Sequence, residues 1–464
     1  MTQPTRSDVI VIGSGQAGVP LAVRLAAAGK TVVIAERATF GGTCVNYGCT
    51  PTKTMIASAR AAHVARTCSR LGVRVSDVQI DFAAVVARKD EVVKRWREGV
   101  ERRLRDAGER LRVVHGHARF VGPHEVDIAG ERFAADKIIT DVGARPAVPT
   151  LPGLETVPWL DNRRAMDLRN LPEHLVVVGG GYVGCELAQM FRRFGSEVTV
   201  VQRGARLLAR AEPEAADELA RVFVAEGIHV KLGASVESVA SAGGGITVRL
   251  SGGEELHGSH LLVAVGREPN TDDLGCEAAG LRLDARGYIE IDDAYRTNVP
   301  GIYAVGDCDG GPQFTHTSWD DHRILFDLLV GRTSEGAARE RGGRVIPAVV
   351  FTDPQVATVG LTEAAARARG VAHESATVPF GWIARAFETG ETAGILKVLV
   401  DPATERILGA TIVGAEAGEL IHIFAVLMQA RAPARAIVDV EIAHPTFAEG
   451  VQSVLMKLKR YALS

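Results

Sequence analysis

The sequence predicts an α/β protein with two doubly wound parallel sheets, followed by a smaller α+β region. Two distant stretches, 8–28 and 175–194, each combine a short apolar strand, a glycine-rich turn and an apolar helix. A short apolar run followed by such a turn is typical of a strand buried on both faces of a parallel sheet. From about residue 343 the pattern changes to strands, helices and polar turns, which favours a separate third region.

The amino-acid composition limits the classes of function that this protein can have. The chain of 464 residues is long enough for about three domains. A formal net charge of −3 gives no reason to expect a nucleic-acid or anionic-membrane partner. The sequence shows no signal peptide and no apolar run near the roughly 18 residues of a membrane span. Because six cysteines do not make a secreted disulfide scaffold, we expect a cytoplasmic protein that acts on a small molecule, and we assign no metal ligand.

The first glycine-rich turn predicts a dinucleotide site. It reads GSGQAG over residues 13–18, directly after the strand 8–12 and before the helix 19–28. The next apolar run, 31–35, ends at Glu36. Such glycines let the backbone approach a pyrophosphate at a helix N-terminus, and the acid bonds a ribose hydroxyl. Strand, turn, helix and acid occur in the required order, which makes the prediction specific.

Two cysteines lie five positions apart in the next motif, which reads GGTCVNYGCTPTK over residues 41–53. Regular helix would put Cys44 and Cys49 on different faces, so a disulfide between them needs a bent backbone, which the flanking glycines permit. We expect Thr50 as N-cap and Pro51 as first residue of a helix that includes 52–66. Cys49 would then lie near a helix N-terminus, where the dipole favours a thiolate. Two unrelated buried cysteines are the alternative, but then the glycines and the cap serve no purpose.

This motif closely resembles the redox disulfide of the FAD-dependent pyridine nucleotide-disulfide oxidoreductases. That family includes glutathione reductase, dihydrolipoyl dehydrogenase and mercuric reductase, and the resemblance covers nearly the whole chain. It implies that Cys49 faces the flavin as the charge-transfer thiolate and that Cys44 is the interchange thiol. In residues 300–307, PGIYAVGD resembles the second FAD motif, with Asp307 on the ribitol chain, and the helix that follows would point its N-terminus at the flavin. The residues expected to bind FAD are Gly13, Gly15, Gly18, Glu36, Gly42, Thr43, Lys53, Gly143, Asp307 and Thr315.

The second glycine-rich turn, GGGYVG over residues 179–184, is interpreted as the NAD(P) site. Its second strand, 197–201, ends at Gln202 and not at an acid. An acid there would favour the ribose 2′-OH of NAD, whereas a neutral residue with nearby arginines suits the 2′-phosphate of NADP. The alternative is that Arg203 and Arg206 are only solvated at the surface and bind no phosphate. We expect NADPH, with NADH possible, and Tyr182 matches the lid tyrosine of the family. The residues expected to bind the nicotinamide cofactor are Gly179, Gly181, Tyr182, Gly184, Gln202, Arg203, Arg206 and Gly266.

Two further pairs are implied by the resemblance. Lys53 lies in a first helical turn, where the macrodipole disfavours a cation, so a compensating acid is expected. The matching pair of the family, beside the flavin N5, would be Lys53 and Glu186. The stretch IAHPTFAE over residues 442–449 matches the acid–base pair of the family, which would be His444 and Glu449. In the family this His reaches the dithiol of the other subunit, so a homodimer with shared active sites is expected.

The expected organisation is two Rossmann-like FAD- and NAD(P)-binding domains plus a C-terminal α+β dimerisation domain. The expected segments are a first FAD part at 1–149, the NAD(P) domain at 150–268, a second FAD part at 269–342 and the dimerisation domain at 343–464. The catalytic residues are expected to be Cys44, Cys49, Lys53, Glu186, His444 and Glu449.

The expected reaction passes electrons from NADPH through FAD to the Cys44–Cys49 disulfide and on to a disulfide or mercuric-reductase-like acceptor. The stretches TCVNYGCTPTKT and FTHTSWDD, with Val142, resemble the mercuric-reductase-like branch, but residues 455–464 lack the cysteine pair of mercuric reductases, and His444 is kept. The alternatives are a dihydrolipoyl dehydrogenase component of a 2-oxo acid dehydrogenase complex, a metal-ion (mercury or copper) or quinone reductase, and a flavin-bearing redox sensor.

Overall fold

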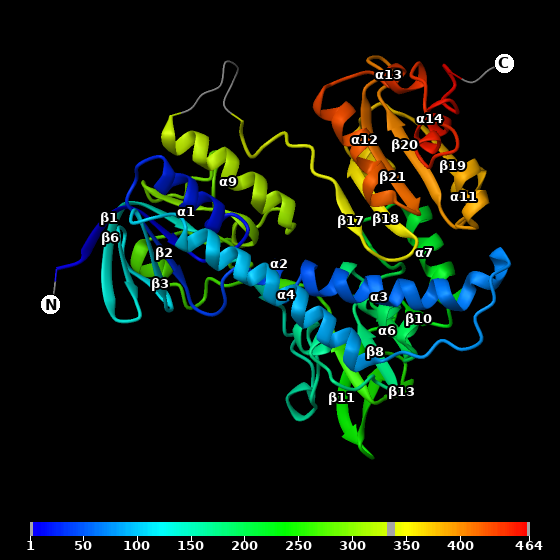
Figure 1. The fold of residues 1–464 in the computed structure, drawn as a ribbon, viewed down its shortest axis with the longest axis horizontal. Helices are drawn as coiled ribbons and strands as arrows, with labels where there is room; N and C mark the ends of the chain where they lie inside the picture. The colour runs from blue at the N-terminus through cyan, green and yellow to red at the C-terminus, as the bar shows by residue number, and fades with distance from the viewer. Residues whose placement is uncertain (1–2, 332–338, 462–464) are drawn as a thin grey trace. The chain divides into compact units, whose positions relative to one another are not determined.

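The computed structural model describes residues 3–331 and 339–461. The chain divides into two compact units, each assembled from three separate stretches (Figure 1). Unit 1 consists of residues 1–54, 87–147 and 266–344, and unit 2 of residues 55–86, 148–265 and 345–464. Three of the predicted segments (1–149, 269–342 and 343–464) include residues outside the described ranges, and the four-part division stays a prediction.

A seven-stranded sheet forms the centre of unit 1, with the order β3-β2-β1-β6-β5-β4 and with β16 also paired to β6. β1 is parallel to β2 and β6, and its Ile12 lies beside Ala35 and Thr140, so the carboxyl ends of these strands meet at one edge. β4 and β5 are antiparallel additions. The strands are β1 (Thr5–Ile12), β2 (Val32–Glu36), β3 (Leu111–His115), β4 (Ala118–Gly122), β5 (Glu125–Ile128), β6 (Glu131–Thr140) and β16 (Ile302–Ala304).

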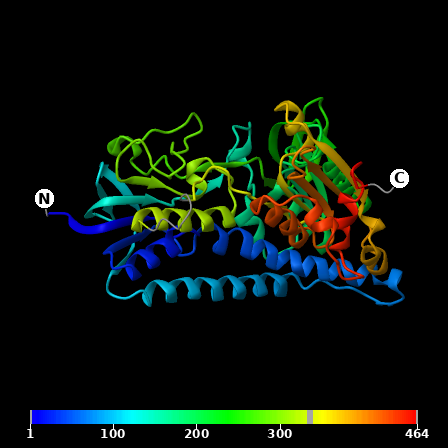
Figure 2. The ribbon, with the colours of Figure 1, turned by 90° about the horizontal axis from the view of Figure 1, so that it is seen from above.

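Two helices of unit 1, α1 (Gly18–Ala27) and α9 (Thr315–Val330), pack against each other and run side by side in Figures 1 and 2. Their contact includes Arg24, whose guanidinium lies 3.8 Å from the ring centroid of Phe326. The long charged helix α4 (Phe82–Arg105) adds Val100 and Leu104 to the same apolar core. A two-stranded ribbon completes this unit: β7 (Ala144–Pro146) and β15 (Arg267–Pro269).

Unit 2 holds a four-stranded parallel sheet of order β10-β9-β8-β14 and a three-stranded antiparallel meander. Its core includes Phe82 against Phe194 at 5.7 Å between ring centroids, and Met55 of α3 (Cys49–Thr67) packs in the same cluster. The elements are β8 (His174–Val178), α6 (Tyr182–Phe194), β9 (Glu197–Gln202), α7 (Pro213–Ala225), β10 (His229–Leu232), β11 (Val236–Ala242), β12 (Gly245–Leu250), β13 (Glu255–Gly258) and β14 (His260–Val263).

The last stretch of unit 2 forms a five-stranded antiparallel sheet of order β17-β18-β21-β20-β19. Helix α12 packs on β18 and β21, and α14 packs on β19 and β20. The expected α/β class with a final α+β region is therefore confirmed. The elements are β17 (Ala348–Val350), β18 (Gln355–Gly360), α10 (Glu363–Ala368), β19 (Glu374–Pro379), α11 (Ala384–Thr389), β20 (Ile395–Val400), β21 (Ile407–Gly414), α12 (Ala417–Gln429), α13 (Arg435–Val438) and α14 (Glu449–Leu455).

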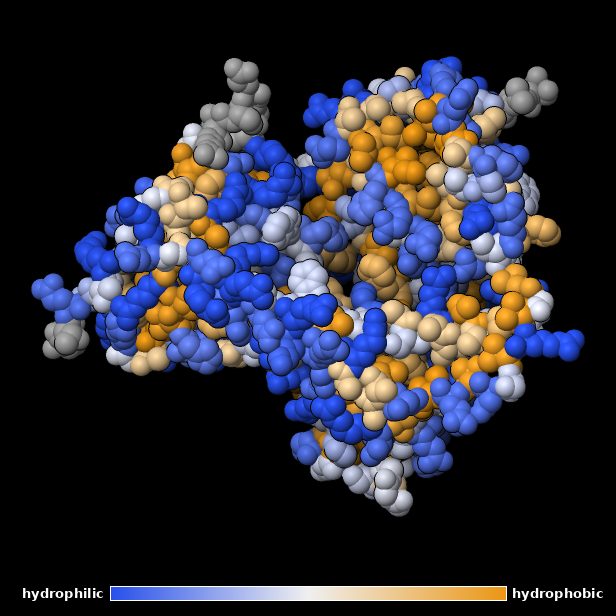
Figure 3. All heavy atoms as spheres, in the orientation of Figure 1, coloured by the Kyte–Doolittle hydropathy of each residue, from blue (hydrophilic) through white to orange (hydrophobic). Residues whose placement is uncertain are grey.

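Apolar side chains also reach the surface of unit 2. Figure 3 shows them gathered over α12, where Val426 is 66% exposed. Trp382 and Phe387 are exposed in the same unit. Among the residues that the structure describes, no helix is both long and apolar enough to cross a membrane.

Candidate active site

The dithiol stretch forms two helices in place of one bent loop: α2 (Gly42–Asn46), which carries Cys44, and α3 (Cys49–Thr67). Gly41 and Gly42 have φ values of +100° and +62°, which side chains disfavour. A Cβ on Gly42 would lie 2.9 Å from the Cα of Gly15, so the stretch lies directly against the first glycine-rich turn.

The predicted start of α3 is wrong by two residues. The helix begins at Cys49, not at Pro51, because the carbonyl of Gly48 accepts hydrogen bonds from the backbone N–H of Thr52 at 3.1 Å and from its hydroxyl at 2.7 Å. Thr50 therefore lies inside the first turn and is not the cap. Cys49 consequently occupies the first position of the helix, where the dipole acts most strongly on its sulfur.

Of the two cysteines of the dithiol, Cys44 is half-buried and Cys49 is exposed. The Sγ of Cys49 lies 3.3 Å from the hydroxyl of Thr315. The hydrogen bond that Cys44 shares with Cys49, together with burial, raises the pKa of Cys44 well above its ordinary value, although Thr315 and Lys53 act in the opposite direction. Cys44 therefore keeps its proton at neutral pH.

The first glycine-rich turn is shaped by close backbone approaches. Gly13 has φ +102°, and a Cβ there would lie 2.2 Å from the carbonyl oxygen of Asp141. A Cβ on Gly18 would lie 2.5 Å from the carbonyl oxygen of Gly13. Glu36, at the end of β2, accepts hydrogen bonds from the backbone N–H and the hydroxyl of Ser14, at 3.1 and 2.6 Å. The turn therefore exposes bare backbone at the start of α1 beside a carboxylate, which fits the pyrophosphate and ribose of FAD.

The second FAD motif reaches the start of α9 through a short 3-10 turn, η3 (Gly306–Asp309). The carboxylate of Asp307 lies 2.8 Å from the guanidinium of Arg267. Burial raises the pKa of Asp307, and Arg267 opposes that effect. Within the first turn of α9, the hydroxyl of Thr317 is buried without a hydrogen-bond partner. An orphaned hydroxyl at the start of this helix fits the polar edge of a bound flavin.

Gly143 and Gly266, which were predicted to bind FAD and the nicotinamide cofactor, lie next to the β7–β15 ribbon. Gly143 precedes β7 with φ +66°, and Gly266 precedes β15 with φ +140°. The carbonyl of Gly266 accepts a hydrogen bond from Ala147, and the carbonyl of Gly143 accepts one from Asn270. These positions therefore shape the points at which the chain leaves and re-enters unit 1.

The second glycine-rich turn in unit 2 repeats the geometry of the first. Gly179 has φ +112°, and a Cβ on Gly184 would lie 1.9 Å from the carbonyl oxygen of Gly179. Gly181 is the N-cap of α6, which begins at Tyr182. The side-chain oxygen of Gln202 accepts a hydrogen bond from the backbone N–H of Gly180 at 2.9 Å, as Glu36 does from Ser14. Gln202 therefore fills the place of the acid without its charge.

The two arginines after β9 have different surroundings. Arg203 is exposed, whereas the Nε of Arg206 lies 2.8 Å from the carboxylate of Asp217. Burial raises the pKa of Tyr182, and Arg210 opposes that effect, so Arg210 lies close enough to influence the predicted lid tyrosine. Sequence reasoning missed Asp217 and Arg210 because their proximity depends on how the chain folds back after β9.

Glu186 is 5% exposed, and its carboxylate accepts a hydrogen bond from the backbone N–H of Phe351 at 2.9 Å within unit 2. Lys53 belongs to unit 1. The Lys53–Glu186 pair therefore stays a prediction.

The predicted acid–base pair is formed within unit 2. The Nδ1 of His444 lies 2.9 Å from one carboxylate oxygen of Glu449, and the other oxygen accepts a hydrogen bond from the backbone N–H of Thr446 at 2.9 Å. The hydrogen bond from Glu449 raises the pKa of His444. The pKa of Glu449 is lowered, first by Thr446 and then by His444. Since Glu449 engages Nδ1, Nε2 is the ring nitrogen of this exposed imidazole that is left to accept or donate a proton.

Four cysteines remain outside the dithiol. Cys185, Cys276 and Cys308 are buried, as expected of small core residues, whereas Cys68 is only half-buried. Among the described residues, no cluster of three or more His, Cys, Asp or Glu side chains could hold a metal ion. His316 stacks on Phe314 at 5.2 Å between ring centroids, which is a packing role.

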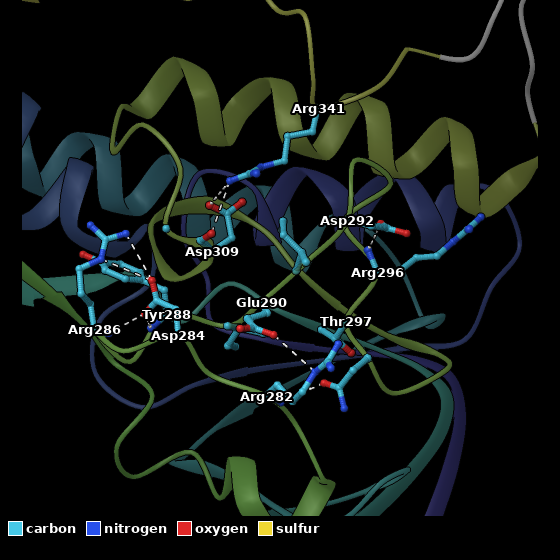
Figure 4. A pocket seen from close by; sticks show the side chains of 14 residues that line it. Arg282, Asp284, Arg286, Tyr288, Glu290, Asp292, Arg296, Thr297, Asp309 and Arg341 are labelled. Atoms are coloured by element: carbon cyan, nitrogen blue, oxygen red, sulfur yellow. Dashed lines mark hydrogen bonds and ion pairs between the residues drawn. The ribbon is translucent and has the colours of Figure 1, made fainter.

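A polar pocket of about 540 Å³ lies elsewhere in unit 1 and contains none of the predicted site residues. Figure 4 shows Arg282 directed at Glu290 and Arg341 directed at Asp309. Arg282 pairs with Glu290 at 3.4 Å, and Arg341 pairs with Asp309 at 3.1 Å. These two arginines are therefore engaged by acids of the same pocket and are not left for a phosphate.

Two family models match the chain. The model described as pyridine nucleotide-disulphide oxidoreductase matches residues 7–321, and the dimerisation domain of the same family matches residues 346–455. A mercuric reductase from Lysinibacillus sphaericus is 34% identical over 96% of this chain and 81% of its own length. The probable pyridine nucleotide-disulfide oxidoreductase RclA of Escherichia coli is 35% identical over 97% of this chain and 99% of its own.

A solved structure has the same fold. The Cu(II) complex of the HOCl-induced flavoprotein disulfide reductase RclA from Escherichia coli is 34% identical, with a TM-score of 0.88 over 97% of this chain and 99% of that one. The family model alone covers more than half of the residues. This chain therefore belongs to the pyridine nucleotide-disulphide oxidoreductases, enzymes that use FAD and a pyridine nucleotide, and it carries their dimerisation domain.

Proposed function

We propose that this enzyme uses NADPH to reduce, through FAD and the Cys44–Cys49 dithiol, an acceptor that is a disulfide or a thiol-reactive metal ion. The observation that carries the proposal is the Cys49–Thr315 contact of 3.3 Å, because it joins the dithiol to the helix of the second FAD motif. The paired His444 and Glu449 supply the acid–base group that exchange with a disulfide requires.

FAD, when bound, supplies the two-electron chemistry that links the nicotinamide to the dithiol. Gly13, Gly15, Gly18 and Glu36 would hold its pyrophosphate and ribose, with Gly42 and Thr43 beside them and Asp307 on the ribitol chain. The start of α9 at Thr315 would stabilise negative charge on its pyrimidine edge. Lys53 and Glu186 are proposed as the pair beside its N5.

The two thiols have different proposed roles. Cys49, at the first position of α3, is stabilised as a thiolate by the helix dipole and by the nearby hydroxyl of Thr315. Cys44 keeps its proton until a base removes it, because its pKa is raised. That base is His444 of a second subunit, so Cys44 becomes the nucleophile only when the acceptor site is assembled. The net reaction with a disulfide is RSSR + NADPH + H⁺ → 2 RSH + NADP⁺.

NADPH is the proposed electron donor. Gln202 engages the glycine-rich turn without placing a negative charge beside a 2′-phosphate, and exposed Arg203 can pair with that phosphate. Arg206 can join it if its ion pair with Asp217 opens. NADH would gain nothing from either arginine.

The proposed assembly is a homodimer with shared active sites. The exposed apolar side chains of unit 2, including Val426 on α12, suit burial against a second copy. His444 is exposed, so it is accessible to the dithiol of another chain. The dimerisation domain of the family, residues 346–455, contains both features.

Reduction of a metal ion is the second form of the same activity. The Escherichia coli relative was solved as a Cu(II) complex, and another relative is a mercuric reductase. A thiolate pair is the natural ligand for such thiophilic ions. We therefore include Cu(II) and Hg(II) among the acceptors to be tested.

The deciding experiment is a steady-state assay with NADPH or NADH against disulfides, Cu(II), Hg(II) and quinones, with dihydrolipoamide in the reverse direction. The proposal expects NADPH to support reduction of a disulfide or metal ion and expects Cys44→Ser to abolish it. Cys68→Ser serves as the control, because Cys68 lies outside the dithiol. Full activity of Cys44→Ser would show that electrons leave from the flavin. A fast reverse reaction with NAD and dihydrolipoamide would favour the dihydrolipoyl dehydrogenase alternative.

A further inference from the structure

Asp141 is a buried carboxylic acid beneath the first glycine-rich turn. It directly follows β6 and is 6% exposed. One of its carboxyl oxygens accepts a hydrogen bond from the backbone N–H of Gly18, the first residue of α1, at 2.7 Å. The N-cap of α1, Ala17, makes no side-chain cap hydrogen bond. Asp141 thus caps, from another strand, the helix whose N-terminus would bind the pyrophosphate.

The carboxyl group touches both FAD motifs. A Cβ on Gly15 or Gly18 would lie 2.6 or 2.8 Å from its Oδ2, and a Cβ on Gly306 would lie 2.8 Å from its Oδ1. The absence of a side chain at these three glycines therefore leaves the space that the Asp141 carboxyl group fills. A change in the charge of this carboxyl group acts on both FAD motifs at once.

The electrostatic surroundings of Asp141 disfavour its ionised form. The charged groups that act on it most strongly are the acids Asp307 of η3, Asp321 of α9 and Glu36 of β2. Asp307 already pairs with Arg267, and Asp321 pairs with Arg344 at 2.8 Å. Burial, followed by these acids, raises the pKa of Asp141 well above its ordinary value, while the Gly18 hydrogen bond opposes the shift.

A bound pyrophosphate would add negative charge at the same helix end. Its phosphodiester groups stay ionised across neutral pH, so they repel an ionised Asp141 and tolerate a protonated one. We propose that Asp141 is a positioning residue that caps α1 in its protonated form, so that binding of FAD is coupled to uptake of one proton by this carboxyl group. The balance is protein–COO⁻ + H⁺ + FAD → protein–COOH·FAD.

The sign of the pH dependence follows from this linkage. FAD binding raises the pKa of Asp141 further, so the affinity for FAD falls as pH rises above the pKa of the FAD-free protein. Between the two pKa values the Kd for FAD increases by up to about tenfold per pH unit. Below both values the affinity is constant.

The test dilutes the holoenzyme and follows the return of flavin fluorescence, which gives the Kd for FAD between about pH 6 and 9. The wild type should bind FAD less tightly as pH rises, and a flat profile would overturn the proposal without any variant. Asp141→Asn keeps an oxygen for the N–H of Gly18 and cannot ionise. Its Kd should be independent of pH and equal to that of the wild type at low pH.

The matched control is Asp8→Asn, which removes an exposed acid of β1. The pKa of Asp8 is lowered by its hydrogen bonds to Thr31, so Asp8 is ionised over the whole range and its removal should leave the slope unchanged. If the Kd for FAD of Asp141→Asn depends on pH as that of the wild type does, the proposal is overturned. Loss of the slope only in Asp141→Asn separates proton coupling from a merely structural role, which would change the affinity equally at every pH.

Discussion

The Sγ of Cys49 lies 3.3 Å from the Oγ1 of Thr315, although the two residues are 266 positions apart. Cys49 begins α3 and Thr315 begins α9, so two helix N-termini converge on one thiol. Both dipoles favour negative charge at that sulfur, and the hydroxyl can donate a hydrogen bond to it.

The first prediction concerns this hydroxyl. Thr315→Val keeps the shape of the side chain and removes the donor, so the Cys49 thiolate becomes less stable. A hydrogen bond to a charged group contributes about 1.5–3 kcal/mol, and exposure of Cys49 reduces this towards the lower end. The long-wavelength absorbance of the Cys49 thiolate beside oxidised FAD, measured in Cys44→Ser, should then appear at a pH about one unit higher. Thr315→Ser should behave as the wild type, and an unshifted titration in Thr315→Val would assign no role to the hydroxyl.

A second prediction concerns the choice of nucleotide. Arg203→Ala should raise the KM for NADPH by about tenfold, because a charged contact to the 2′-phosphate is lost. Its KM for NADH should change little, since NADH lacks that phosphate.

Asp217→Asn tests the same site in the opposite direction. It releases Arg206 from its ion pair and should lower the KM for NADPH without affecting NADH. Glu218→Gln is the control, because Glu218 pairs with Arg221 on the same helix and not with Arg206. A wild type that turns over faster with NADH would contradict the arginine assignment.

The parts that were predictable from sequence are those encoded locally. The strand–turn–helix order at residues 8–28 and 175–194 is confirmed by β1 with α1 and by β8 with α6, because glycine spacing and apolar runs act over neighbouring residues. The start of α3 was wrong because the carbonyl of Gly48, which looks like a loop residue, begins the helix.

Long-range contacts could not be predicted in this way. Asp141 follows an apolar strand 123 positions from Gly18, and only the parallel pairing of β1 with β6 brings them together. Asp217 of α7 likewise meets Arg206 through the fold, since α7 packs on β10, the strand that pairs with β9. A charge pattern along the chain does not reveal which arginine already has an acidic partner.

A third prediction concerns pH and uses the His444–Glu449 contact. Because Glu449 raises the pKa of His444, the protonated imidazole persists to higher pH than it would alone. Because neutral His444 must first take the proton of Cys44 before it passes that proton to the departing thiolate, disulfide reduction should decline as pH falls through the raised pKa. Glu449→Gln removes the charge that raises this pKa, so the decline should begin at lower pH. The measurement is kcat/KM for the disulfide against pH, and identical profiles in both proteins would exclude this role for Glu449.

The fourth prediction is that each active site needs two chains. Cys44→Ser and His444→Ala homodimers should each be inactive with a disulfide. A heterodimer of the two variants has one site with an intact dithiol from one chain and an intact His444 from the other. Subunit exchange, verified by two different affinity tags, should therefore restore activity to about half per dimer. Verified heterodimers without activity would mean that His444 serves its own subunit or no site.

The last prediction separates the acceptor classes. Reduction of a disulfide releases a thiolate that must be protonated, and a positioned acid contributes about 10²–10⁴-fold in rate. Reduction of a metal ion or quinone releases no such leaving group. His444→Ala should therefore lose disulfide reduction by about that factor and retain reduction of Cu(II) or a quinone.

Flavin reduction by NADPH, followed by stopped-flow absorbance, should be nearly unchanged, because His444 acts after that step. His257→Ala, which removes an exposed histidine of β13, controls for a general effect on the fold. Equal losses with every acceptor would mean that His444 supports the structure of the site, whereas full activity of Cys44→Ser/His444→Ala with the physiological acceptor would make the flavin the point of electron exit.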